Sequence, residues 1–204
     1  MKYSIPELIE TVYLYFPRGL QGDESSYTQT PEYLRRMQAR VPASARFRDW
    51  VFMLNRIEAR LPTSENPELI VHNGSPFLAS PTASHLDRCF SGALSLPPRG
   101  EWEEVHKLEF MVSFVVPYYV IYSMSFAKDL QPVGGLVLGP DITFDFSADE
   151  VPFVDIIREE VLATFPDYET MPPEVGKTIV PDVIGGGNLY GESTIYGCLF
   201  SDNW

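Results

Sequence analysis

An alternating pattern of side chains on both sides of Pro117 constrains the fold more than any other feature of this chain. In residues 108–115, and again in residues 118–126, one set of apolar side chains occupies every second position. A period of two residues is typical of a β-strand. A tight hairpin that pairs the two segments is one interpretation, and a single bent strand or a helix is the alternative.

Two segments in the first half carry the signals of helices. Thr30-Pro31-Glu32 predicts a helix start, because Thr is a good N-cap and Pro suits the first helical position. We expect this helix to end near Arg40, before Pro42. Ser44 is the expected cap of a second helix that continues to about Leu61. The second helix has one apolar stripe, because its apolar residues recur at steps of three and four: Phe47, Trp50, Val51, Leu54, Ile57 and Leu61.

The other elements are predicted from shorter signals. A capping box at Ser147-Ala148-Asp149-Glu150 indicates a third helix to about Phe165, with one side formed by Val154, Ile157, Val161 and Phe165. Residues 73–100 are rich in Ser, Pro and Gly and are predicted to be mostly loop. Further strands are expected at residues 10–16, 68–72, 134–138, 177–183 and 194–200, with Gly185-Gly186-Gly187-Asn188 joining the last two.

These elements predict an α+β fold with a mixed, largely antiparallel sheet and three or so helices packed against it. We expect residues 1–204 to form a single domain, because the chain shows neither repeats nor a linker. Cys89 and Cys198 are expected to be free, buried thiols. No apolar run reaches the roughly 18–20 residues of a membrane span, and the N-terminus lacks an apolar signal region. A cytoplasmic location is the simplest expectation.

The charge of the chain is strongly one-sided. Residues 101–204 carry 18 Asp and Glu against 4 Lys and Arg, whereas residues 1–100 carry 10 against 11. The net charges of the two halves are therefore −14 and +1. The electrostatic field of such a charge distribution affects which partners a protein binds and how fast it associates with them. It argues against nucleic acid as a partner, because the nucleic-acid backbone requires basic side chains. A basic partner protein is favoured.

The densest acidic run lies between residues 141 and 160. One interpretation is a solvated loop and helix face, and the other is an anionic patch that meets the basic cleft of a protein partner. A third is internal charge balance, in which arginines of the two N-terminal helices lie against the acidic half. The candidate partner-binding residues are Asp141, Asp145, Asp149, Glu150, Asp155, Glu159 and Glu160.

Signals for catalysis are weak. The chain contains no nucleotide-binding glycine loop, serine-hydrolase elbow or paired-cysteine motif. His85 and Asp87 could share one face of a strand, but a metal site needs further ligands. His72 and His106 have no partner at ligand spacing. We expect ordinary surface or core histidines, and no catalytic residue, cofactor or metal.

A partial nuclease-like pattern is also present. Asp167 is followed by Glu174 and Lys177, whereas nucleases of the restriction-endonuclease class use an Asp and a Glu-x-Lys on adjacent strand positions. Here the lysine comes one residue too late, which would turn it to the opposite face of a strand. The acidity of the chain would also repel DNA. The pattern does not indicate a nuclease.

Three blocks of the chain are similar to the bacterial polymorphic-toxin immunity proteins, and most closely to the family called immunity protein 52. The blocks are Phe16-Pro17-Arg18-Gly19-Leu20, Gly139-Pro140-Asp141-Ile142-Thr143-Phe144-Asp145-Phe146 and Leu199-Phe200-Ser201-Asp202-Asn203-Trp204. The resemblance covers most of the chain and rests on layout and aromatic-acidic blocks. It identifies no contact residues.

The resemblance implies a cytoplasmic antitoxin that neutralises a cognate toxin by tight, stoichiometric binding. The implied toxin is a nuclease of restriction-endonuclease fold, delivered by a type VI or related secretion system. An acidic protein could occupy the basic groove of such a DNase. Two other hypotheses are a hydrolytic or metal-dependent enzyme using His85 and Asp87, and a secretion-system adaptor with residues 118–122 at an interface.

Overall fold

A computed structural model describes residues 2–20, 26–61, 68–70, 88–99, 104–126, 141–184 and 191–200. The described part forms a six-stranded sheet of order β1-β2-β3-β4-β5, in which β6 pairs with β4. Only the β4–β6 pairing is parallel, so the predicted α+β fold with a largely antiparallel sheet is confirmed. The strands are β1 Glu68–Ile70, β2 Cys89–Arg99, β3 Glu104–Ser113, β4 Tyr118–Phe126, β5 Asp141–Thr143 and β6 Glu169–Thr170.

The alternating segments on both sides of Pro117 form the antiparallel pair β3 and β4. Glu109 lies opposite Tyr122, and Val112 lies opposite Tyr119. Pro117 stands in the connection between the strands, where a residue without a backbone N–H breaks no ladder hydrogen bond. The hairpin interpretation is therefore correct.

Three long helices correspond to the three predicted ones. The Thr30 cap is confirmed, because Tyr33 N–H donates to Thr30 Oγ1 at 3.2 Å. The first helix nevertheless continues through Pro42 to Ala45, although a proline in a helix interior is unfavourable. Ser44 thus lies inside that helix and does not cap the next, whose N-cap is Arg46. The three helices are α2 Pro31–Ala45, α3 Phe47–Arg60 and α4 Val151–Thr164.

Two predicted strands are instead helices. Residues 10–16 belong partly to α1, Ile5–Tyr13, which begins at Ser4, whose N–H donates to the Glu7 carboxylate at 2.7 Å. Residues 194–200 contain α6, Ile195–Leu199, because Thr194 Oγ1 accepts a bond from Gly197 N–H at 3.0 Å. In both segments a local cap outweighs the strand propensity of β-branched and aromatic residues.

The predicted loop at residues 73–100 is wrong over its last part, which forms β2. Gly92 fits this strand because the Phe110 ring occupies the space of a side chain: a Cβ there would lie 2.7 Å from Phe110 Cζ. The strand pairing becomes irregular between Leu96 and Arg99, around two prolines. Residues 71–87, 134–138 and 185–188 lie outside the described residues, so the expectations for them stay predictions. Of the strand expected at residues 177–183, one bridge forms, between Ile179 and Thr194.

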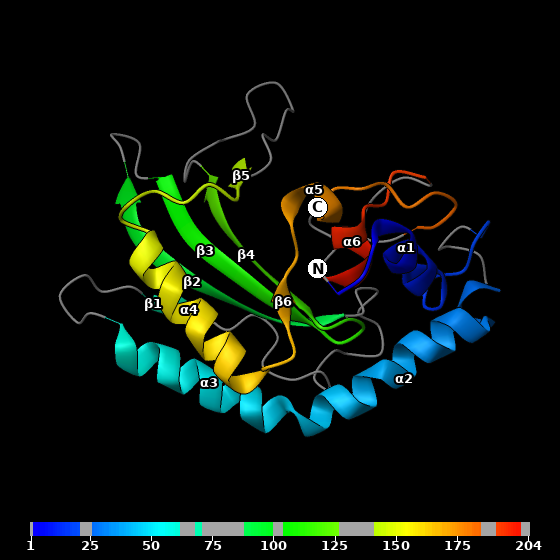
Figure 1. The fold of residues 1–204 in the computed structure, drawn as a ribbon, viewed down its shortest axis with the longest axis horizontal. Coiled ribbons are helices and arrows are strands. Elements are labelled where there is room, and N and C mark those ends of the chain that lie inside the picture. The colour runs from blue at the N-terminus through cyan, green and yellow to red at the C-terminus, as the bar shows by residue number, and fades with distance from the viewer. Residues whose placement is uncertain are drawn as a thin grey trace.

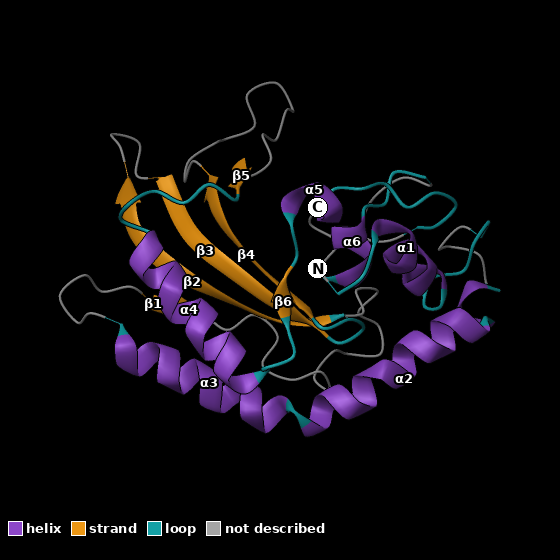
Figure 2. Cartoon of the chain, in the orientation of Figure 1, coloured by secondary structure: helices purple, strands orange, loops and turns teal. Residues whose placement is uncertain are grey.

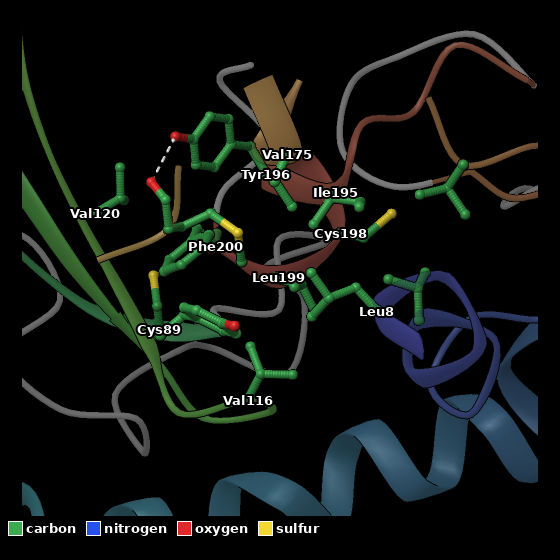
Figure 3. Close-up of a cluster of buried hydrophobic side chains, with 14 of the residues drawn as sticks. Leu8, Cys89, Val116, Val120, Val175, Ile195, Tyr196, Cys198, Leu199 and Phe200 are labelled. Carbon is green, nitrogen blue, oxygen red and sulfur yellow. Dashed lines mark hydrogen bonds between the residues drawn. The ribbon is translucent and has the colours of Figure 1, made fainter. Parts of the chain in front are cut away.

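The long helices α3 and α4 lie on a different side of the sheet from α1 and α6 (Figures 1 and 2), and each face of the sheet carries its own core. On the α3/α4 face, Phe110, Val112 and Ile121 pack against Trp50, Ile57 and Val161 of the two long helices, with other residues of the same cluster. On the α1/α6 face, Met111, Val120 and Tyr122 pack against α1, α6 and α5 Pro173–Gly176. Figure 3 shows Tyr196, Leu199 and Phe200 beside Cys89 and Val120 in this second core. A short 3-10 helix, η1 Tyr27–Gln29, precedes α2.

Candidate partner-binding surface

The predicted acidic patch divides into exposed and internal carboxylates. Asp141, Asp145 and Asp149, on β5 and the connection to α4, are exposed. Glu150 at the start of α4 and Glu160 within it are buried. Asp155 is half-buried and Glu159 is exposed, both on α4. The seven residues therefore do not form one solvent-facing patch.

Aromatic and apolar side chains fix the segment that carries the exposed aspartates. Ile142 and Phe144 pack against the core of the α1/α6 face, whereas Phe146 packs against the core of the α3/α4 face. The Phe144 ring stacks on that of Tyr196, with centroids 5.5 Å apart and planes at 10°. Because Phe144 and Phe146 are held by the two cores, Asp145 between them is presented to solvent from an anchored backbone.

Glu150 fastens the start of α4 to the sheet. Its Oε1 lies 2.8 Å from His106 Nε2, and Ser123 Oγ lies 3.0 Å from the same ring nitrogen. Its Oε2 accepts a hydrogen bond from Ser147 N–H at 2.7 Å, the backbone half of the predicted capping box. The side chains of His106, Ser123 and Glu150 are all buried. This cluster joins β3, β4 and α4, and no pattern in the sequence predicts it.

The hydrogen bonds of this cluster favour an ionised Glu150. Burial raises the pKa of its carboxyl group, but bonds from Ser123, Ser147 and His106 outweigh burial and lower the pKa to about 2. The acid is therefore a charged anchor for the segment at neutral pH.

The cluster lacks the geometry of a Ser–His–acid catalytic group. In such a group the serine and the acid bind different ring nitrogens, so that the acid orients the histidine toward the serine. Here Ser123 and Glu150 both lie against Nε2, while His106 Nδ1 is buried without a hydrogen-bond partner among the described residues. The arrangement fits a structural role, and His106 is a core histidine as expected.

The acids of α4 face arginines of α3. Arg56 Nε lies 2.6 Å from Glu160 Oε2, and Arg60 contacts Glu159 at 2.6 Å and Glu160 at 2.9 Å. Burial raises the pKa of Glu160, but the two arginines outweigh it and the pKa is lowered. Internal charge balance is therefore correct for this part of the acidic run. Of the seven candidate residues, the exposed ones outside α4 are Asp141, Asp145 and Asp149.

Other candidate residues do not assemble into a reaction site. Glu174 belongs to α5, and Lys177 is its C-cap, so this stretch is not the strand of a restriction-type nuclease. Tyr118, Tyr119 and Tyr122 are buried in the two cores, so their side chains are not available to an adaptor interface. Cys89 and Cys198 are free and buried, as expected.

Metal ligation finds no support in the residues that the structure describes. Within them, no group of three or more His, Cys, Asp and Glu side chains is placed to hold a metal ion. His72, His85 and Asp87 lie outside the described residues. Across the same described ranges, none of the helices has the length and apolar character needed to cross a membrane.

Comparisons of the chain with family models, with curated proteins and with solved structures find no match.

Proposed function

We propose that this protein is a non-enzymatic, cytoplasmic immunity protein that binds and neutralises a cognate toxin. The toxin is a basic nuclease domain delivered by a type VI or related secretion system. The observation that carries the proposal is the presentation of Asp141, Asp145 and Asp149 on a segment anchored in both cores. The resemblance to immunity protein 52 supplies the class of partner.

The physical logic is charge complementarity. A nuclease needs a basic groove for phosphate groups, and carboxylates on an anchored segment can enter or border such a groove. The anchoring by Phe144, Phe146 and Glu150 limits the conformational entropy that binding would cost. The net charge of −13 would accelerate the encounter at low salt. Asp141, Asp145 and Asp149 are the proposed contact residues.

The test is co-purification of the chain with the product of the adjacent gene, followed by a nuclease assay with and without the chain. We expect a stable complex that abolishes cleavage. A triple variant, Asp141→Lys, Asp145→Lys and Asp149→Lys, should slow association and weaken its dependence on salt.

A matched control reverses three exposed acids elsewhere, Glu10→Lys, Glu58→Lys and Glu174→Lys, and changes the net charge equally. If both triple variants slow association to the same extent, net charge and not this surface would be responsible. If the wild-type chain neither binds the adjacent product nor protects cells that express it, the immunity role is wrong.

A further inference from the structure

Exposed apolar side chains gather on one layer of helices. Seven large apolar side chains of the described residues are exposed, and four of them lie on α3 and α4: Val51, Phe52, Val151 and Leu162. The two helices pack side by side over one face of the sheet (Figure 1). Val151 and Leu162 are about three turns apart and share one side of α4. Phe52, Val151 and Leu162 define what we call the outer α3/α4 face.

Contacts between the two helices bring Phe52 and Leu162 to the same part of this face. Arg56, one helical turn after Phe52, donates hydrogen bonds to Glu160 and Thr164, which lie on either side of Leu162 in the sequence. Both apolar side chains are exposed, whereas the core-facing positions of the two helices are buried. Single exposed apolar residues are ordinary on a protein surface, but apolar residues that gather on one surface mark an interaction site.

The outer α3/α4 face is almost neutral, unlike the segment that precedes it. The helices α3 and α4 together carry four arginines against five acids, whereas residues 141–150 carry four acids and no base. The ion pair of Arg158 with Asp155, at 2.6 Å, adds to the pairs between α3 and α4. Val151 follows Asp149 by two residues, so the neutral face continues directly from the acidic segment (Figure 1).

A neutral apolar face beside exposed carboxylates matches the two parts of a protein interface. Charges at the rim of an interface accelerate the encounter with an oppositely charged partner, and their loss changes mainly the association rate. A long-lived complex also needs an interface core that is poor in charge, in which a few large side chains are buried as anchors. The three exposed aspartates supply the rim charges but no such anchor.

We infer that the outer α3/α4 face is the apolar core of the toxin interface, with Phe52 and Leu162 as its anchors. Val151 links this core to the acidic segment. The inference rests on the proposed function and specifies the partner further: the toxin surface that fits has an apolar patch beside its basic groove. The aspartates then set the association rate, and the outer α3/α4 face sets the dissociation rate.

The test is stopped-flow kinetics of the full chain with the adjacent gene product. The double variant Phe52→Ala and Leu162→Ala should raise the dissociation rate constant about tenfold or more and change the association rate constant by less than about twofold. The matched control, Leu14→Ala and Leu34→Ala, removes two leucines of α1 and α2 that are 51% and 49% exposed, against 48% and 38% for the tested pair. It should leave both rate constants unchanged. Glu58, reversed in the charge control above, lies outside this face, since it is half a helical turn from the α3 residues that contact α4.

The outcomes separate this inference from the proposed function. If the wild-type chain binds and the triple aspartate variant slows association, but the Phe52 and Leu162 double variant dissociates like the wild type, the inference is wrong and the proposed function stands. Equal acceleration of dissociation in the double variant and in its leucine control would also overturn the inference. The absence of any complex would overturn both.

A second measurement uses only the wild-type chain and therefore does not depend on the folding of a variant. The chain is deuterated except at its Val and Leu methyl groups and is bound to the protonated adjacent gene product. Saturation of the partner's protons should reduce the methyl signals of Val151 and Leu162 and leave those of Leu14 and Leu34 unchanged. Undiminished signals of Val151 and Leu162 in a formed complex would overturn the inference as well.

Discussion

The two faces of the sheet are covered in different ways. Two 14-residue helices, α3 and α4, cover one face, and their arginine–glutamate contacts tie them to each other. The other face is covered by shorter helices of nine, four and five residues and by the segments between them. The first face is organised by helical periodicity over long segments. The second depends on local caps and on close approaches at single residues.

The cores of the two faces are both in contact with the acidic segment between β5 and α4. Phe144 belongs to the core of one face and Phe146 to the core of the other, while Glu150 reaches His106 on β3. The segment is thus held by both layers at once. Its exposed aspartates are therefore carried on a backbone that both cores hold in place.

The largest effect is expected in the core of the α3/α4 face. Trp50 is fully buried and stacks on Phe90 with centroids 5.1 Å apart. Trp50→Ala should lower the free energy of unfolding by about 3–5 kcal/mol, measured by urea denaturation. The control Phe52→Ala removes a ring of α3 that is 48% exposed and should change it by less than about 0.5 kcal/mol. Equal effects of the two variants would contradict the assigned orientation of α3.

The next effect tests close packing on the α1/α6 face. Gly176 at the end of α5 lies directly against the Tyr196 ring, so an added Cβ would overlap ring carbons. Gly176→Ala should cost about 1–3 kcal/mol in the free energy of unfolding. In the background of Tyr196→Leu the same change should cost clearly less, because the ring is gone. An unchanged cost in that background would show that this contact does not limit residue 176.

A smaller effect with a pH signature is expected at Glu150, where the two faces meet. Glu150→Ala leaves the buried His106 Nε2 and the Ser147 N–H without their acceptor, which should cost about 1–3 kcal/mol in the free energy of unfolding.

The lowered pKa of Glu150 determines in which direction its contribution to the free energy of unfolding changes with pH. The folded pKa of about 2 lies below the ordinary value of 4.5, so the ionised anchor stabilises fully above pH 4.5. That stabilisation is lost as the pH falls through about 2. Urea denaturation at a series of pH values should show the gap between wild type and Glu150→Gln narrowing over this window. A gap that stays constant with pH would exclude the ionised anchor.

Elements whose periodicity extends over many residues are predictable from the sequence. The stripe that includes Trp50, Leu54 and Ile57 is buried, as are Val154 and Val161 of α4, and the alternation around Pro117 marks the hairpin. Val51, expected on the same stripe as Trp50, is instead 36% exposed, because it lies at the margin of the apolar arc.

Elements whose type depends on a single contact are not predictable from the sequence. The cap at Thr194 and the space filled by Phe110 beside Gly92 turned an expected strand into a helix and an expected loop into a strand. The capping-box signal located Glu150, but no pattern joined it to His106, because 44 residues separate them and only the fold brings them together. The acidic run is therefore evident from the sequence, whereas its division into exposed and internal acids is not.

The smallest effect on stability is expected at Asp145. This variant distinguishes a role of the aspartate in binding a partner from a role in holding the segment in place. Asp145 is exposed, and Phe144 and Phe146 on its two sides hold the backbone without it. Asp145→Lys should therefore change the free energy of unfolding by less than about 0.5 kcal/mol. It should nevertheless slow association with the adjacent gene product at low salt, in a stopped-flow measurement.

The comparison variant is Phe144→Ala, which keeps the charge but removes the ring that stacks on Tyr196. Because its ring is half-buried, this change should lower the free energy of unfolding by less than the about 3–5 kcal/mol expected for a fully buried phenylalanine, but clearly more than Asp145→Lys does. A loss of stability in Asp145→Lys comparable to that in Phe144→Ala would mean that the aspartate itself anchors the segment. The exposed carboxylates would then have a structural role, and this result would contradict their proposed role in binding a partner.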